Sequence, residues 1–92
     1  MIESFACRDT ARLAQGLRVR RFVAIERAAR RKLRQLDIAG RLDDLRIPPG
    51  NRLELLRGDR AGQYSIRVND RYRVCFTWSQ GVARDVEILD YH

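Results

Sequence analysis

The apolar residues of this 92-residue chain change their spacing once, and this change limits the folds that the chain can adopt. In the first half they recur every three or four positions, which is the period of an amphipathic helix. In the second half they alternate with polar residues, which is the period of a half-buried strand. A proline-rich turn from Ile47 to Asn51 separates the two patterns, and proline ends a helix. We therefore expect helices followed by strands.

Two helices are predicted before the proline-rich turn. Asp9 and Thr10 offer N-cap oxygens for a short helix that continues through Ala14. A longer helix is predicted from Arg20 to Leu36, followed by one further turn over residues 40–45. The apolar face of the longer helix consists of Phe22, Ile25, Ala29, Leu33 and Leu36. The stretch from Ile2 to Cys7 favours an extended conformation.

Four short strands are predicted after the turn, over residues 53–56, 63–68, 72–78 and 85–89. Hairpin turns are predicted at Asn69-Asp70 and at Ser79-Gln80-Gly81, and strands spaced this closely pair as an antiparallel meander. The fold class is therefore α+β, with N-terminal helices packed on one face of one twisted antiparallel sheet. We expect a single domain over residues 1–92, since neither half has a core of its own.

The charge of the chain favours a polyanionic partner. It has 19 Lys and Arg residues against 12 Asp and Glu residues, a formal net charge of +7, and Lys32 is its only lysine. Guanidinium groups suit phosphate oxygens, so RNA, DNA or an acidic protein would each fit. The arginines of the longer helix at positions 20, 27, 30, 31 and 34 form either a solvated exterior or a surface that attracts RNA or an acidic antagonist.

Cys7 and Cys75 are far apart in the sequence, and neither has a second cysteine or a histidine at the spacing of metal ligands. We therefore assign no metal, no cofactor and no thiol chemistry. The chain has no apolar run long enough to span a membrane, and its first residues do not resemble a secretory signal. We expect a cytoplasmic protein with no membrane partner.

Candidate catalytic residues lie on the predicted strands and at the end of the chain. Alternation turns Glu54 away from the core face of Leu53 and Leu55, and it makes Arg73 point with Arg67 and Arg71 across the same polar face. Metal-free RNA cleavage needs a base for the 2′-hydroxyl proton, cations for the charge on phosphorus and an acid for the 5′-oxygen.

These three requirements can be met by four residues of the chain. Glu54 supplies the base, and His92, the only histidine, supplies the acid. Arg57 and Arg73 supply the cations. The alternative interpretation is that the strand residues are solvated and that His92 is an uninvolved chain end.

Three segments together resemble a known family. They are Pro48-Pro49-Gly50-Asn51-Arg52-Leu53-Glu54-Leu55-Leu56, then Gly58-Asp59-Arg60-Ala61-Gly62-Gln63-Tyr64-Ser65-Ile66-Arg67-Val68-Asn69 with Tyr72-Arg73-Val74-Cys75-Phe76, and the terminal Asp90-Tyr91-His92. The combination resembles the HigB-type toxins of the RelE superfamily of toxin–antitoxin systems. The resemblance implies a RelE-like fold and an endoribonuclease that cuts mRNA in the ribosomal A site. It also implies a HigA-type helix-turn-helix antitoxin, and operator DNA bound only through the toxin–antitoxin complex.

The resemblance also suggests roles for individual residues. Arg73 resembles the phosphate-contacting arginine of the family, and Asp90, Tyr91 and His92 match its terminal catalytic cluster. Glu54 departs from members that have histidine there, so the general base is either Glu54 or Asp90. The expected RNA- and phosphate-binding residues are Arg52, Arg57, Arg60, Arg67 and Arg71. A non-catalytic subunit of the same fold, binding nucleic acid or an antitoxin, is the alternative function.

Overall fold

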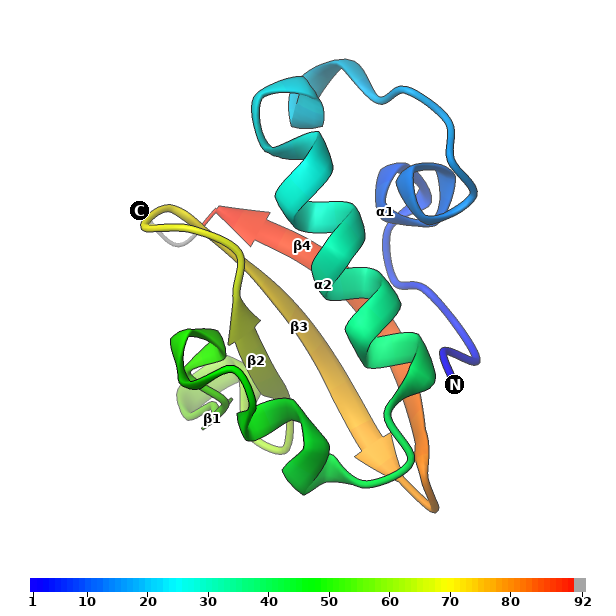
Figure 1. Cartoon of the computed structure of the whole chain (residues 1–92). Helices are drawn as coiled ribbons and strands as arrows, with labels where there is room; N and C mark the ends of the chain where they lie inside the picture. The colour runs from blue at the N-terminus through cyan, green and yellow to red at the C-terminus, as the bar shows by residue number, and fades with distance from the viewer. Residues whose placement is uncertain (91–92) are drawn as a thin grey trace.

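The computed structural model describes residues 1–90 and places two α-helices against one face of a four-stranded antiparallel sheet (Figure 1). The strands lie in the sheet in the order of the chain, which is the predicted meander. The α+β architecture expected from the change of period is therefore confirmed. The helices and strands are α1 (Arg8–Ala14), α2 (Glu26–Ile38), β1 (Glu54–Leu55), β2 (Tyr64–Arg67), β3 (Tyr72–Ser79) and β4 (Val82–Asp90). Short 3-10 helices are η1 (Arg20–Ile25), η2 (Leu42–Arg46), η3 (Pro49–Asn51) and η4 (Gly58–Arg60).

Helix α1 begins one residue before the predicted N-caps. Its N-cap residue is Cys7, which makes no side-chain capping bond, so the capping prediction for Asp9 and Thr10 is wrong. Both residues instead contact distant parts of the chain. Asp9 forms an ion pair with Arg21 at 3.2 Å, and the buried Thr10 hydroxyl accepts a hydrogen bond of 3.0 Å from the Ile88 N–H. Thr10 thereby ties α1 to β4.

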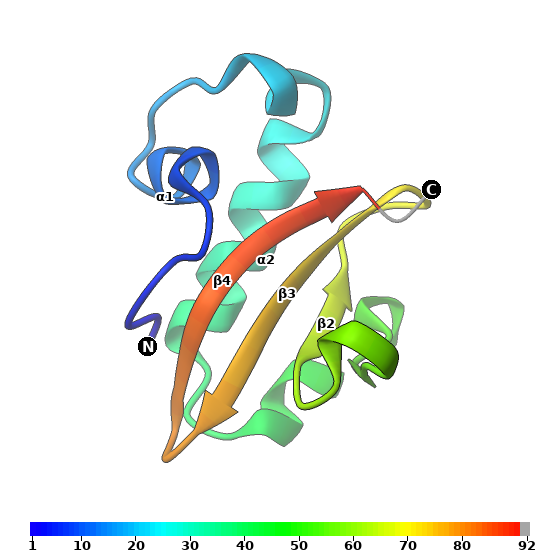
Figure 2. The ribbon, with the colours of Figure 1, turned by 180° about the vertical axis from the view of Figure 1, so that it is seen from behind.

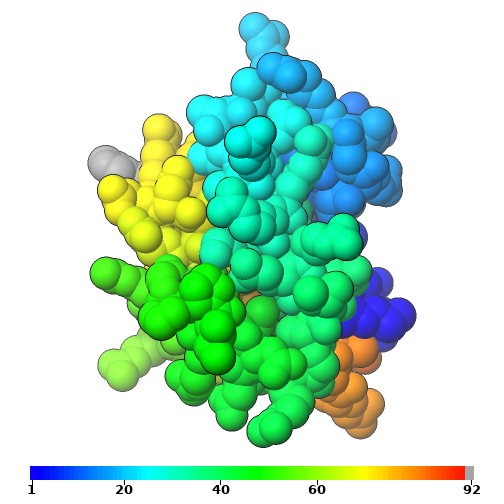
Figure 3. All heavy atoms as spheres, viewed as in Figure 1, coloured from blue at the N-terminus to red at the C-terminus, as the bar shows by residue number. Residues whose placement is uncertain are grey.

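The segment predicted as one long helix is divided into η1 and α2. All five of the predicted apolar residues are nonetheless buried, with exposed fractions of 6% or less. They pack against the sheet residues of a single hydrophobic cluster, and burying each large aliphatic side chain contributes about 1.5–3 kcal/mol. The opposite side of α2 forms the outer surface of the molecule in the view of Figure 3. None of the helices within residues 1–90 is long and apolar enough to cross a membrane.

The two predicted hairpin turns are present. Asn69 Oδ1 accepts hydrogen bonds from the N–H groups of Arg71 and Tyr72, which closes the turn between β2 and β3. Gln80 and Gly81 both have positive φ angles between β3 and β4, as tight hairpin turns require. Strand β4 begins earlier than predicted and includes a register shift opposite Cys75 and Thr77, so the sequence alternation held only for its second half.

Both edges of the sheet differ from the predicted four-stranded meander. The N-terminal stretch forms two isolated parallel bridges, Ile2 with Ala83 and Phe5 with Val86, and thus lies along β4. At the other edge, β1 has only two residues, and Leu55 is 61% exposed rather than part of the core. Leu53 does pack against the core, and Leu56 is buried. Cys7 and Cys75 are not joined in a disulfide bond.

Candidate active site

One face of the sheet is turned away from α1 and α2, and it is here called the open face (Figure 2). The strand register places Glu54, Ser65 and Arg73 on this face. Side chains directly opposite each other on neighbouring strands share a face, and those next to each other along a strand do not. One row on the open face consists of Glu54, Ser65, Cys75 and Glu87, and the next consists of Arg67, Arg73 and Leu89. The intervening row of Ile66, Val74 and Ile88 is buried against the helices.

Arg73 is held against the open face by two hydrogen bonds. Its Nε donates to Ser65 Oγ at 2.8 Å, and its Nη2 donates to the main-chain oxygen of Arg52 at 2.7 Å. The same Nη2 lies 3.8 Å from Glu54 Oε1. Only 12% of the Arg73 side chain is exposed, so this cation has a defined position on the sheet.

Glu54 and Arg73, which the sequence predicted as base and phosphate-binding cation, therefore lie side by side. Glu54 comes from the edge strand β1 and Arg73 from β3, with Ser65 of β2 between the two strands. The Glu54 side chain is 56% exposed, which leaves its carboxylate accessible to a ligand on the open face. A carboxylate that accepts a proton beside a cation that stabilises negative charge is an arrangement suited to phosphoryl transfer.

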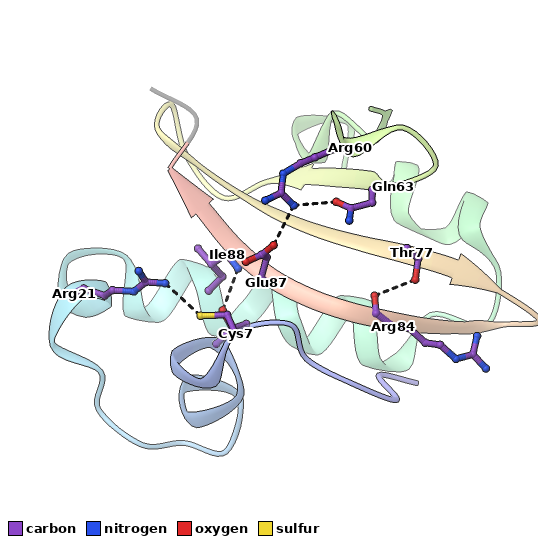
Figure 4. A network of polar contacts seen from close by, with 9 residues as sticks. Cys7, Arg21, Arg60, Gln63, Thr77, Arg84, Glu87 and Ile88 are labelled. Carbon is purple, nitrogen blue, oxygen red and sulfur yellow. Dashed lines mark hydrogen bonds and ion pairs between the residues drawn. The ribbon is translucent and has the colours of Figure 1, made fainter. Parts of the chain in front are cut away.

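Arg60 has a different environment from the one expected of an RNA-binding residue. Its Nη1 donates hydrogen bonds of 3.0 Å to Gln63 Oε1 and to Glu87 Oε1 (Figure 4). This ion pair connects the loop after β1 to β4. Arg67, in turn, is paired with Asp70 of the neighbouring turn. Both guanidinium groups thus already have a carboxylate partner within the protein.

Asp90 is paired with Arg71, and its partner in the strand register on β3 is Tyr72. The Arg71 Nε donates to Asp90 Oδ2 at 2.8 Å, and this bond raises the pKa of Arg71 above its usual range. The Arg71 guanidinium also lies 5.5 Å from the centre of the Tyr72 ring, and Tyr72 packs edge-on against Phe22 on the helix side. Arg71 therefore does not follow Arg73 across the open face, contrary to the prediction from alternation.

Comparison with known proteins identifies the family of the chain. A family model described as "RelE-like toxin of type II toxin-antitoxin system HigB" matches residues 15–92. Over 69 residues the chain is 54% identical to "Toxin HigB-1" of Vibrio cholerae serotype O1, an alignment that covers 75% of this chain and 72% of that protein. The chain belongs to the HigB-like toxins. It is thus the toxin of a type II toxin–antitoxin system, and its partner is an antitoxin.

A second relative of this HigB-like toxin is a protein of Haemophilus influenzae described as "Uncharacterized protein". The two are 39% identical over 62 residues, which cover 67% of the toxin and 60% of the relative. This match adds no information about activity, because its name assigns none.

The remaining predicted site residues of the toxin fall into two groups. Arg52 and Arg57 have exposed side chains that form no ion pair with another side chain of residues 1–90. Tyr91 and His92 lie outside the described residues, so their predicted roles stay predictions. Within residues 1–90, no group of three or more His, Cys, Asp or Glu side chains is placed to hold a metal ion.

Two partners of Arg73 were missed in the sequence. Ser65 is fully buried on the central part of the sheet, and the Arg52 main-chain oxygen is an acceptor that no side-chain pattern reveals. The one available signal for Ser65 is its place as a small polar residue between Tyr64 and Ile66 in a predicted strand. Its contact with Arg73 depends on the strand register, which was not predicted.

Proposed function

We propose that this toxin is an endoribonuclease that cuts mRNA in the ribosomal A site and thereby inhibits translation. The resemblance to HigB-type toxins implies this activity, and membership in the family supports it. The observation that carries the proposal is the pair formed by Glu54 and Arg73 on the open face, 3.8 Å apart. This pair combines a proton acceptor and a phosphate-binding cation at one position.

The proposed reaction is an attack of the RNA on its own backbone. Glu54 accepts the proton of the ribose 2′-hydroxyl, and the 2′-oxygen forms a bond to the adjacent phosphorus. The bond between phosphorus and the 5′-oxygen breaks, and that oxygen takes a proton from His92. The products are a 2′,3′-cyclic phosphate and a 5′-hydroxyl, and the residues of the protein account for both proton transfers without a metal or cofactor.

The cations of the open face have unequal roles in this proposal. Arg73 stabilises the charge that develops on the phosphate, and the exposed Arg57 provides a second contact. Arg60, Arg67 and Arg71 are each paired with a carboxylate, so they reach RNA only by exchanging that partner. Arg52 acts on Arg73 through its main-chain oxygen and is exposed for contact with RNA through its side chain.

The terminal residues complete the proposed site. Tyr91 stacks on or orients a nucleotide, and Asp90 orients His92 or Arg73. Asp90 is also the next candidate for the base if Glu54 does not act as one. Because Asp90 contacts Arg71 whereas Glu54 lies beside Arg73, the contacts support Glu54 in this role.

The proposed partners follow from the charge of the surface and from the family. Arg27, Arg31 and Arg34 of α2 are exposed and would contact ribosomal RNA. A HigA-type helix-turn-helix antitoxin would bind the toxin, and the complex would bind operator DNA. The toxin would act in the cytoplasm, where its ribosomal target is located.

The test is to map cut sites on translating mRNA for the wild type and its variants. Loss of the base in Glu54→Gln should lower the cleavage rate by about 10²–10⁴-fold. Arg73→Ala and His92→Ala should also lose cleavage while remaining folded, and wild-type cleavage should persist in excess EDTA with intact ribosomes. Asp59→Asn, which changes an exposed carboxylate of the nearby loop, is the matched control and should cut normally.

Two results would contradict the proposal. Full cleavage by both Glu54→Gln and Arg73→Ala would show that the open face is not the site of chemistry. Growth arrest by the wild type without any cut mRNA would favour the non-catalytic function. If Asp90→Asn abolishes cutting and Glu54→Gln does not, the base is Asp90.

A further inference from the structure

Arg73 uses only part of its hydrogen-bonding capacity within residues 1–90. A guanidinium group has five N–H donors. Ser65 Oγ and the Arg52 main-chain oxygen accept one each, from Nε and from Nη2. The other three donors, two on Nη1 and one on Nη2, have no hydrogen-bond acceptor among residues 1–90. Arg73 is therefore fixed on one side and keeps several donors for a ligand.

Ser65 is placed where its hydroxyl can determine the orientation of Arg73. It is fully buried in β2, opposite Glu54 on one side and Cys75 on the other. Arg73 lies diagonally across from it on β3 and reaches over β2 toward β1. The Ser65 hydroxyl accepts its hydrogen bond from Arg73 Nε at 2.8 Å.

The second acceptor is also held in place by buried contacts. Asn51 is fully buried, and its side-chain amide donates to the Leu45 main-chain oxygen and to Gln35 Oε1 at 3.1 Å. Its Oδ1 accepts a hydrogen bond from Lys32 Nζ, which anchors the turn to α2. The next residue, Arg52, has a left-handed φ of 46°. The Arg52 carbonyl thus projects toward Arg73 from an anchored turn.

The distance between Arg73 and Glu54 shows what these two acceptors prevent. Guanidinium and carboxylate groups that pair without restraint form hydrogen bonds of about 2.7–2.9 Å, often two at once. Here the nearest nitrogen and oxygen are 3.8 Å apart. A direct pair would occupy the donors that a phosphate needs and the carboxylate oxygen that a 2′-hydroxyl needs. The hydrogen bonds to Ser65 and Arg52 keep the Arg73 guanidinium too far from Glu54 for a direct hydrogen bond.

We propose that Ser65 is a positioning residue, which with the Arg52 carbonyl keeps the Arg73 guanidinium oriented toward the scissile phosphate and apart from Glu54. This inference rests on the proposed function, because it assigns a role relative to Arg73 as the phosphate-binding cation. Ser65 touches neither substrate nor reacting atoms in this scheme and acts through Arg73 alone. Its removal should slow the chemical step and leave binding of the ribosome and mRNA unchanged.

The experiment compares single-turnover cleavage on programmed ribosomes for Ser65→Ala and for Thr10→Ala. Both variants remove a fully buried hydroxyl that accepts one hydrogen bond, but Thr10 lies on the helix side. Ser65→Ala should lower the maximal rate by about 10–100-fold, the scale expected when a reacting group is misplaced. Its half-saturating ribosome concentration should change by less than about twofold. Thr10→Ala should lose stability in urea unfolding but keep the wild-type maximal rate.

Rescue and additivity separate positioning from general damage. Ser65→Thr restores a hydroxyl and should recover most of the rate, whereas Ser65→Cys, with a weaker acceptor, should be intermediate. Adding Ser65→Ala to Arg73→Ala should cause no further loss, because Ser65 acts only through Arg73. If Ser65→Ala does not fold, the comparison of Ser65→Cys with Ser65→Thr takes its place, and equal rates for the two would overturn the inference.

The two possible failures are distinguishable. Wild-type cleavage by Arg73→Ala would overturn the proposed function itself. Loss of cleavage in Arg73→Ala together with a wild-type maximal rate in folded Ser65→Ala would leave the proposed function intact and overturn the role of Ser65. A fall in rate that is equal in Ser65→Ala and Thr10→Ala would show a structural role instead of a positioning one.

Discussion

The two faces of the sheet are built from the same strands but are held by different forces. On the helix-covered face, Ile66, Val74 and Ile88 are at most 1% exposed and pack among other apolar side chains. On the open face, Glu54 is 56% exposed and lies 3.8 Å from Arg73, which is held by hydrogen bonds to Ser65 and Arg52. Packing of the first kind depends on volume and apolar area, and contacts of the second kind depend on direction.

Because the faces alternate along a strand, a residue that contributes to stability can be the direct neighbour of a residue of the candidate site. Arg73 and Val74 are neighbours in β3, yet the first faces the open side and the second is in the core. Full burial of a large aliphatic side chain contributes about 1.5–3 kcal/mol, whereas a partly exposed ion pair contributes about 0–1 kcal/mol. We therefore expect substitutions on the helix-covered face to change mainly the free energy of unfolding. Substitutions at the contact between Glu54 and Arg73 on the open face should change mainly the cleavage rate.

The largest effect on stability is expected for Phe76→Ala. Phe76 is fully buried, and its ring lies 6.1 Å from that of Tyr64 and 6.4 Å from that of Trp78. Removal of the ring should lower the free energy of unfolding by about 3–5 kcal/mol, measured by urea denaturation. The control is Leu55→Ala, since Leu55 is an apolar residue of the same sheet that is largely exposed. It should change stability by less than about 0.5 kcal/mol. Leu55 and Phe76 are both opposite Tyr64 and so share a face, and equal losses for the two would show that burial does not determine the cost there.

The helix-covered face could be predicted from the sequence because its apolar residues recur at regular spacings. The spacing of Phe22, Ile25 and Leu33 indicated a buried helix face, and all three side chains are buried. Departures occur where a tertiary partner outweighs a local rule. Thr10 would cap a helix in isolation, but its hydroxyl binds the Ile88 N–H instead. Leu55 alternates correctly, yet β1 is too short to bury it.

The open face could be predicted only in part. Alternation and the family resemblance indicated Glu54 and Arg73, because both belong to polar positions of predicted strands. The sequence predicts the same RNA-binding role for Arg57, Arg60 and Arg67. In the structure, however, Arg60 is paired with Glu87 and Arg67 with Asp70. Which arginine is paired depends on residues brought near it by the fold. The fold brings Glu87 of β4 to Arg60, whereas Asp70 reaches Arg67 from the turn three residues further along the chain.

An intermediate effect is expected for Asn51→Ala, because Asn51 connects the two regions. Its side chain binds Lys32 and Gln35 of α2, and the next carbonyl binds Arg73. The substitution leaves buried polar groups without partners, which should cost about 1–3 kcal/mol in urea unfolding. Cleavage should fall as well, measured below the unfolding transition, because the Arg52 carbonyl loses its anchor.

Gln35→Ala is the control for this variant. It removes one of the partners of Asn51 from the α2 side but leaves the contacts of Asn51 with Leu45 and Lys32. It should therefore cost less stability and leave the cleavage rate unchanged. A loss of stability in Asn51→Ala with no loss of cleavage would show that the turn belongs to the core alone.

The smallest effect is expected for the ion pair that crosses the open face, Arg60 with Glu87. The two side chains are 33% and 21% exposed, so water still screens their attraction. Glu87→Gln should lower the free energy of unfolding by about 0.2–1 kcal/mol, and the effect should shrink at high salt. A double-mutant cycle with Arg60→Met measures the coupling directly. Because Arg60 keeps its contact with Gln63, the loop should stay in place and the maximal cleavage rate should not change. A loss as large as that of Phe76→Ala would mean that polar contacts also determine stability, and the division between the two faces would not hold.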